Sequence, residues 1–371
     1  MDLSRPLWSS QPFKAIYTTY FLLKTPAQLL LLAIAYTAKP FRPQPAWGVK
    51  DNVQAAMARL LFSFWAATRS QRPVYDAPEK ARERHARVGP PPADLFTGVL
   101  APSERARPAA VDAVWFPGAP PADMAGQEVV LHFPGGAFVL AFGHERSGRP
   151  IAGVLNRHFR ADRTVWAQYR LSGTPGACFP AAVQDAVAFY HYLLSLGADP
   201  GNIIVSGDSA GGNVALALAR YVQDNRARLP LPRGFAVFSP WVSVTATAGS
   251  DYDQQDNSRS DVLHSSVLQW GANVYRPQGR LSPEEEALIS PLHRPFELSA
   301  PLYVQAGGAE GMCDQISSFA EEMALVRGNR VLFRSTPGAP HNLPFCHEQF
   351  GLSKELEESL DEAFEFFEWK N

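Results

Sequence analysis

A serine between two glycines, in the sequence Gly-Asp-Ser-Ala-Gly at residues 207–211, constrains this chain more than any other feature. The apolar run before it, residues 202–206, predicts a buried strand, and the small residues after it, 212–219, predict a helix. A G-x-S-x-G sequence at such a turn is typical of a nucleophile elbow, whose strained backbone leaves room only for glycine beside the serine. The start of the helix would direct free backbone N–H groups at the space above Ser209.

The chain beyond residue 128 alternates between strand and helix patterns. The other predicted strands are residues 128–133, 163–168, 234–238, 301–306 and 330–335. Residues 179–196 have the spacing of an amphipathic helix. This alternation predicts an α/β fold with a mostly parallel sheet covered by helices on both faces. Sites in such sheets form at the carboxyl ends of the strands.

Two regions are expected to cap that site. Residues 1–100 form an N-terminal helical cap, and residues 101–371 form the catalytic domain with a cap insertion at about 244–299, where the strand–helix alternation pauses. The pieces predicted within these regions are a helix at 52–67, a linker at 69–92, a loop at 249–259 and a helix at 261–274.

Residues 15–38 are strongly apolar, yet Lys24 and Pro26 leave an uninterrupted run shorter than the roughly 18 residues that a spanning helix needs. No small-residue cleavage site follows, so the segment does not read as a signal peptide. Three interpretations stay open: a lid helix over the site, a helix lying on a membrane surface, or a marginal anchor.

Composition excludes several classes of function. The 34 basic and 36 acidic residues give a net charge of −2 without long runs of either sign, which indicates no nucleic-acid partner. Three scattered cysteines, Cys178, Cys313 and Cys346, form neither a disulfide framework nor a metal-ligand pattern. The cysteines fit a reducing compartment, so we expect an intracellular location, either cytoplasmic or membrane-associated. The chain has no H-E-x-x-H motif, and the serine chemistry described below needs neither a metal nor an organic cofactor, so we expect none.

A serine nucleophile needs a base and a group that orients the base, and with this motif they follow in the order serine, acid, histidine. Glu310 follows the predicted strand 301–306, and His341 follows the predicted strand 330–335. Ser209, Glu310 and His341 are thus the candidate catalytic residues, with Asp314 as an alternative acid. The backbone N–H groups expected to form an oxyanion hole belong to Gly135, Gly136, Ala137 and Ala210.

These motifs resemble those of the hormone-sensitive-lipase-like carboxylesterases. The segments that carry the resemblance are 207–213, 134–138, 169–171, 179–182 with Asp185, and 290–292. The resemblance implies the α/β-hydrolase fold with a helical cap. The N-terminal part, residues 42–47 included, looks most like fungal members, which are often encoded beside genes of secondary metabolism. That association suggests a polyketide- or peptide-derived ester as substrate.

The chain departs from the family at the oxyanion loop. Ungapped matching puts Pro134 where the family has a histidine, with His132 two residues earlier. The acid is glutamate rather than the more common aspartate.

The sequence therefore predicts a serine-dependent hydrolase of a small hydrophobic carboxylic ester, acting through an acyl-enzyme. An acyltransferase, cyclase or lactonase using the same acyl-enzyme is an alternative, and a non-catalytic ligand-binding protein is another. Oligomeric state and natural substrate are left open by the sequence.

Overall fold

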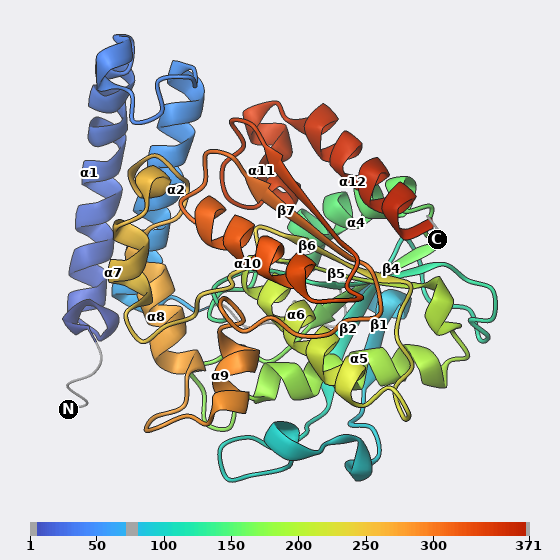
Figure 1. The fold of residues 1–371 in the computed structure, drawn as a ribbon. Helices are drawn as coiled ribbons and strands as arrows, with labels where there is room; N and C mark the ends of the chain where they lie inside the picture. The colour runs from blue at the N-terminus through green and yellow to red at the C-terminus, as the bar shows by residue number, and fades with distance from the viewer. Residues whose placement is uncertain (1–5, 72–80, 369–371) are drawn as a thin grey trace.

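An eight-stranded sheet forms the centre of the computed structural model, which describes residues 6–71 and 81–368 (Figure 1). The strands are β1 (His85–Val88), β2 (Val111–Phe116), β3 (Val129–Phe133), β4 (Arg163–Gln168), β5 (Ile203–Asp208), β6 (Gly234–Phe238), β7 (Leu302–Gly307) and β8 (Val331–Thr336). Their spatial order is β1-β2-β4-β3-β5-β6-β7-β8. Strand β2 is antiparallel to both of its neighbours, and every other pairing is parallel.

Helices cover both faces of the sheet. The helices beside the sheet are α4 (Arg149–His158), α5 (Ala181–Ser195), α6 (Ser209–Asp224), α10 (Cys313–Leu325), α11 (Leu343–Phe350) and α12 (Ser353–Glu368). One apolar core joins α5, α6 and α10 to one face, and a second joins α4 and α12 to the other. In β5, Ile203 and Val205 enter the first core while Ile204 enters the second, as the alternation of a strand buried on both faces requires. The predicted fold is confirmed.

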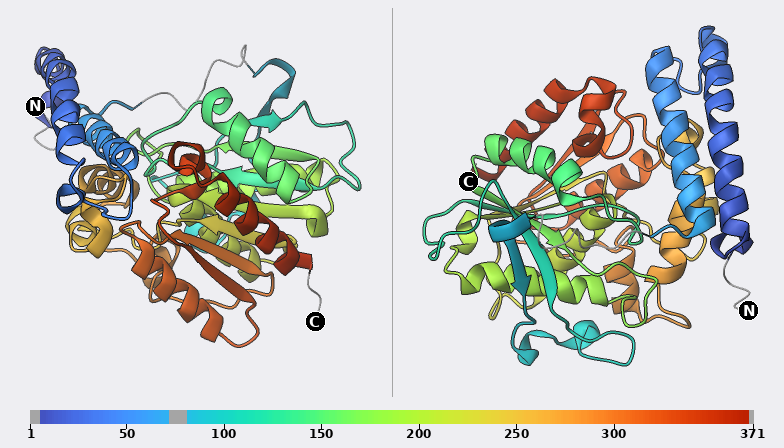
Figure 2. Two further views of the ribbon diagram at one scale, coloured as in Figure 1. Left: turned by 90° about the horizontal axis from the view of Figure 1, so that it is seen from above. Right: turned by 180° about the vertical axis from the view of Figure 1, so that it is seen from behind.

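Further helices lie above the carboxyl ends of the parallel strands. They are α7 (Ala248–Asp253), α8 (Ser265–Tyr275) and α9 (Pro283–Ile289) in the insertion, and α1 (Phe13–Ala35) and α2 (Val49–Thr68) at the N-terminus. We call α1 and α2 the N-terminal hairpin. Helix α2 packs against α8, and α1 packs on the outer side of α2, away from the sheet (Figures 1 and 2).

Several sequence predictions need correction. The expected linker at 69–92 contains strand β1, whose short, partly polar sequence hides its pairing with β2; residues 72–80 lie outside the described part of the chain. The expected loop at 249–259 contains α7 and a 3-10 helix, Asp256–Arg259. Helix α1 continues through Pro26, because its packing along α2 supports both halves and the proline removes only one backbone hydrogen bond.

Candidate active site

The turn from β5 into α6 holds Ser209 in a strained conformation. Ser209 is the first residue of α6 and has φ +53°, a left-handed conformation that is uncommon for residues other than glycine. A Cβ atom on Gly207 would lie 2.5 Å from the carbonyl oxygen of Gly211, and one on Gly211 would lie 2.0 Å from that of Phe133. The two glycines therefore let the turn close against the end of β3, with the serine hydroxyl at its apex.

Ser209, His341 and Glu310 lie in one chain of hydrogen bonds. Nε2 of His341 is 2.8 Å from Oγ of Ser209, and Nδ1 of His341 is 2.5 Å from Oε2 of Glu310. The other carboxylate oxygen of Glu310 accepts a hydrogen bond from the backbone N–H of Gly307, 2.7 Å away. All three side chains are buried, so this arrangement is held largely apart from bulk water.

The electrostatic surroundings favour proton uptake by His341. Burial lowers the pKa of His341, but the hydrogen bond and charge of Glu310, with the charges of Asp261 and Asp208, outweigh burial and raise it above its usual value. A base with a raised pKa holds more strongly the proton that it takes from a serine hydroxyl.

The two candidate acids are not equivalent. Glu310 is 1% exposed and bonded to His341, whereas Asp314 is exposed in the first turn of α10. Glu310 is thus the carboxylate that the fold brings to the histidine.

Sequence reasoning missed Asp261, a fully buried carboxylate in the insertion, between the 3-10 helix Asp256–Arg259 and α8. Its Oδ1 accepts the backbone N–H of His341 at 2.9 Å, and its Oδ2 accepts that of Gly311 at 3.0 Å. The hydroxyl of Tyr252 also donates to Oδ2, at 2.9 Å. Asp261 therefore holds the loop that carries His341 and the loop that carries Glu310 against the insertion. No sequence motif marks it, because it follows the polar run 257–260 and looks like part of a solvated loop.

The glycine loop after β3 lies against the elbow, as expected for an oxyanion hole. Within the described chain, the backbone N–H groups of Gly136 and Ala137 have no acceptor in the protein, and Ala210 lies in the first turn of α6, where N–H groups lack intrahelical partners. Gly135 differs from the expectation, because its N–H donates to Oδ2 of Asp208 at 3.0 Å. The N–H of Gly135 is therefore not available to an oxyanion, and its bond to Asp208 holds the glycine loop against the nucleophile elbow.

An apolar cavity of about 410 Å³ opens onto Ser209 and His341. Its walls include Val53, Met57 and Leu61 of α2, and Leu263 and Val267 from the insertion. Leu263 and Val267 are both buried. None of the described residues of α1 lines the cavity, and the N-terminal helix that does is α2. A lid over the site, one of the three interpretations left open for residues 15–38, is thus a role that falls to α2 in this structure.

The residues that the structure describes contain no group of three or more His, Cys, Asp or Glu side chains placed to hold a metal ion. The donors around Ser209 are instead backbone N–H groups, which are suited to a developing oxyanion.

Comparisons with known proteins agree with this architecture. A family profile described as alpha/beta hydrolase fold matches residues 130–345. An acetyl-hydrolase from Streptomyces hygroscopicus is 30% identical over 270 residues, which cover 72% of this chain and 81% of that protein. An esterase from Acinetobacter venetianus is 29% identical over 244 residues, covering 63% and 73% of the two chains.

Solved structures share the fold. An esterase from the bacterial hormone-sensitive lipase family superposes with a TM-score of 0.57 at 23% identity, covering 87% of this chain and 98% of its own. The hyperthermophilic esterase from the archaeon Pyrobaculum calidifontis gives a TM-score of 0.58 at 20% identity, covering 83% and 93%. The chain therefore belongs to the α/β-hydrolase fold family, and its relatives in that family include an acetyl-hydrolase and an esterase.

Proposed function

We propose that the protein hydrolyses a small hydrophobic carboxylic ester by a Ser209–His341–Glu310 triad. The observation that supports this proposal is the hydrogen-bonded chain from Ser209 Oγ through His341 to Glu310, at the floor of an apolar cavity. A serine hydroxyl attacks an ester only when a base accepts its proton, and here the base is 2.8 Å away.

In the proposed reaction, Oγ of Ser209 attacks the ester carbonyl while Nε2 of His341 takes the hydroxyl proton. The N–H groups of Gly136, Ala137 and Ala210 stabilise the oxyanion. Collapse of the tetrahedral intermediate breaks the ester C–O bond, and the imidazolium returns its proton to the leaving alcohol. Water then attacks the acyl-enzyme with His341 again as base, which releases the acid and restores Ser209. Glu310 orients the imidazole and stabilises its protonated form.

The cavity walls favour an apolar substrate of moderate size. Leucine, valine, methionine and phenylalanine side chains surround the triad, and a cavity of about 410 Å³ accommodates an acyl or alcohol group of several carbons. We propose that this ester is a secondary metabolite derived from a polyketide or a peptide. The basis for this proposal is the resemblance of the N-terminal part to fungal members of the family. We further propose that residues 1–100 and about 244–299 act together as the cap, since α2 and the residues around α8 supply its walls.

Release of p-nitrophenol from acetyl, butyryl and octanoyl esters by the wild type, Ser209→Ala and Ser195→Ala tests the proposal. Ser195 is an exposed serine at the end of α5 and serves as the matched control. We expect activity in the wild type and Ser195→Ala, and its loss in Ser209→Ala. Full activity in Ser209→Ala would overturn the proposal.

Inertness toward all three esters has two explanations, which a serine-directed phosphonate separates. Labelling of Ser209 in inert protein indicates a selective esterase, or an acyltransferase, cyclase or lactonase that uses the same acyl-enzyme. Absence of labelling in folded protein contradicts a reactive serine and favours a ligand-binding role.

A further inference from the structure

Helix α1 turns large apolar residues outward, while its inner side mixes polar residues with apolar ones. Thr25 is buried against the rest of the molecule, and Thr18 and Gln28 are half-buried on the same side. The opposite stripe holds Ile16, Tyr20, Leu23, Leu30 and Ile34, which recur at helical spacing and are 54–75% exposed. Leu22 and Leu31 widen this stripe at 64% and 67% exposure. A surface helix in water turns its polar residues outward, so this exposed apolar face requires an apolar partner.

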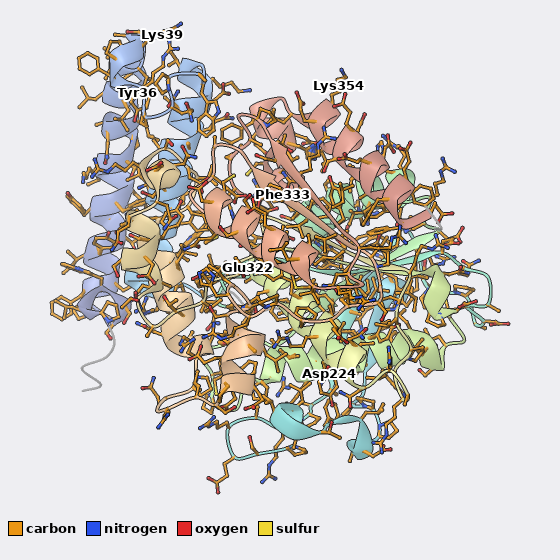
Figure 3. The ribbon with its side chains drawn as sticks, viewed as in Figure 1. Tyr36, Lys39, Asp224, Glu322, Phe333 and Lys354 are labelled. Atoms are coloured by element: carbon orange, nitrogen blue, oxygen red, sulfur yellow. The ribbon has the colours of Figure 1, made fainter. Side chains whose placement is uncertain are left out.

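Charge identifies that partner. From residue 6 to residue 50 the chain carries five basic residues and no Asp or Glu, whereas the whole chain carries 36 acidic against 34 basic residues. The five are Lys14, Lys24, Lys39, Arg42 and Lys50. Lys39 and Tyr36 lie at the turn of the N-terminal hairpin (Figure 3). An exposed leucine-rich stripe flanked by cations, without anions, suits the surface of a bilayer with anionic lipids.

The packing of the hairpin distinguishes lying on a membrane from crossing it. Helix α1 is long and apolar enough to span, but its inner face is packed along α2, with the ring centroids of Phe21 and Phe64 4.5 Å apart. Helix α2 is in turn fixed to the insertion, since Arg59 donates to the carbonyls of Ser258 and Leu263. A spanning α1 would carry Arg59 and these polar contacts into the hydrocarbon, or would have to leave α2.

We propose that α1 lies flat on an anionic lipid surface and immerses only its outer stripe. Helix α2 would then lie between the bilayer and the active-site cavity, and its residues Val53, Met57 and Leu61 line that cavity. A hydrophobic ester dissolved in the membrane would thus meet the enzyme at the wall of the cavity. The lipid-binding claim stands apart from the proposed chemistry, because no residue of the outer stripe contributes to the triad.

Flotation of the full-length protein with phosphatidylcholine vesicles, with and without 30% phosphatidylglycerol, tests the proposal. The stripe variant L23Q/L30Q/I34Q and the charge variant K24E/K39E are compared with L325Q, which alters a leucine that is 86% exposed on α10. We expect binding to the anionic vesicles, reduced about tenfold or more in both α1 variants and unchanged in L325Q. Binding should weaken in high salt and persist in Ser209→Ala, so it can be judged even if hydrolysis fails.

Three outcomes would overturn the proposal. Equal binding of the stripe variant and the wild type would show that α1 does not insert. Protein retained in the bilayer after alkaline carbonate extraction would show a spanning helix. Absence of vesicle binding, with a wild-type dimer that the stripe variant converts to monomer in analytical ultracentrifugation, would show that a second copy covers the stripe. Circular dichroism of each variant verifies that these surface changes leave the fold intact.

Discussion

Nε2 of His132 lies 3.0 Å from Oδ1 of Asp208, and both side chains are buried beneath the nucleophile turn. The ring of His132 also stacks on Trp166, with the centroids 4.8 Å apart. The other oxygen of Asp208 accepts hydrogen bonds from the backbone of Gly135 and the side chain of Asn342. Asp208 therefore joins the oxyanion loop, the nucleophile turn and the histidine loop, and His132 fixes the orientation of its carboxylate.

We expect His132→Phe to lower kcat for p-nitrophenyl butyrate by about 10- to 100-fold with little change in KM. Phenylalanine keeps the stacking on Trp166 but removes the bond to Asp208, so the oxyanion loop loses its alignment while the cavity walls remain. His158 makes a similar bond to Asp361, between α4 and α12 and away from the site. His158→Phe is therefore the control, and an equal fall in kcat in both variants would contradict a positioning role for His132.

Glu310→Gln should reduce kcat by about 10³- to 10⁴-fold, because the amide cannot stabilise the imidazolium of His341. Asp314→Asn, which changes an exposed carboxylate four residues later, should leave kcat within about twofold. Steady-state kinetics on one ester decide between them. If Asp314→Asn were the damaging change, Asp314 would be the acid and the present assignment would be wrong.

Local sequence patterns were sufficient to predict the parallel part of the sheet and the order of the candidate catalytic residues along the chain. Each of these features can be recognised from a short stretch of sequence: the nucleophile elbow, the glycine loop, and the strands that precede Glu310 and His341. The structure then brings Ser209, His341 and Glu310 into hydrogen-bonding distance. Strands β1 and β2 escaped prediction. Strand β1 has only four residues, and two of them, His85 and Arg87, are ionisable. Strand β2 contains Asp112, a charged residue that is buried because it pairs with His85 and Arg87.

The supporting residues could not be found in the same way. Asp261 binds backbone groups 50 and 80 residues further along the chain, and Asp208 and His132 are 76 residues apart. Such contacts exist only after the sheet has assembled, and a lone buried aspartate has no periodicity to reveal it. The orientation of α1 was hidden for a related reason, since apolar residues occur on both faces of that helix.

The pH profile should report the raised pKa of His341. Only the neutral imidazole accepts the serine proton, so kcat/KM should fall as the pH drops through that pKa, with an apparent value above the usual 6.5. Asp261→Asn removes one of the charges that raise the pKa, so the acidic limb should move to lower pH. Asp361→Asn, remote from the site, should leave it in place. A limb that stays fixed or moves upward in Asp261→Asn would show that Asp261 does not act on His341 through its charge.

Substitution at the mouth of the cavity should change selectivity for acyl length. Met57 of α2 lines the cavity and is 37% exposed, so a larger side chain there occupies cavity space without disrupting a core. Met57→Trp should keep acetyl ester hydrolysis within about threefold and lower kcat/KM for the octanoyl ester by about tenfold or more, because the last methylenes lose their apolar surroundings. Leu325→Trp, on the exposed side of α10, controls for an added indole. An equal loss on both esters would place the acyl chain elsewhere, and the neighbouring cavity of about 460 Å³ beyond Phe142 and Phe345 would then be the site to alter next.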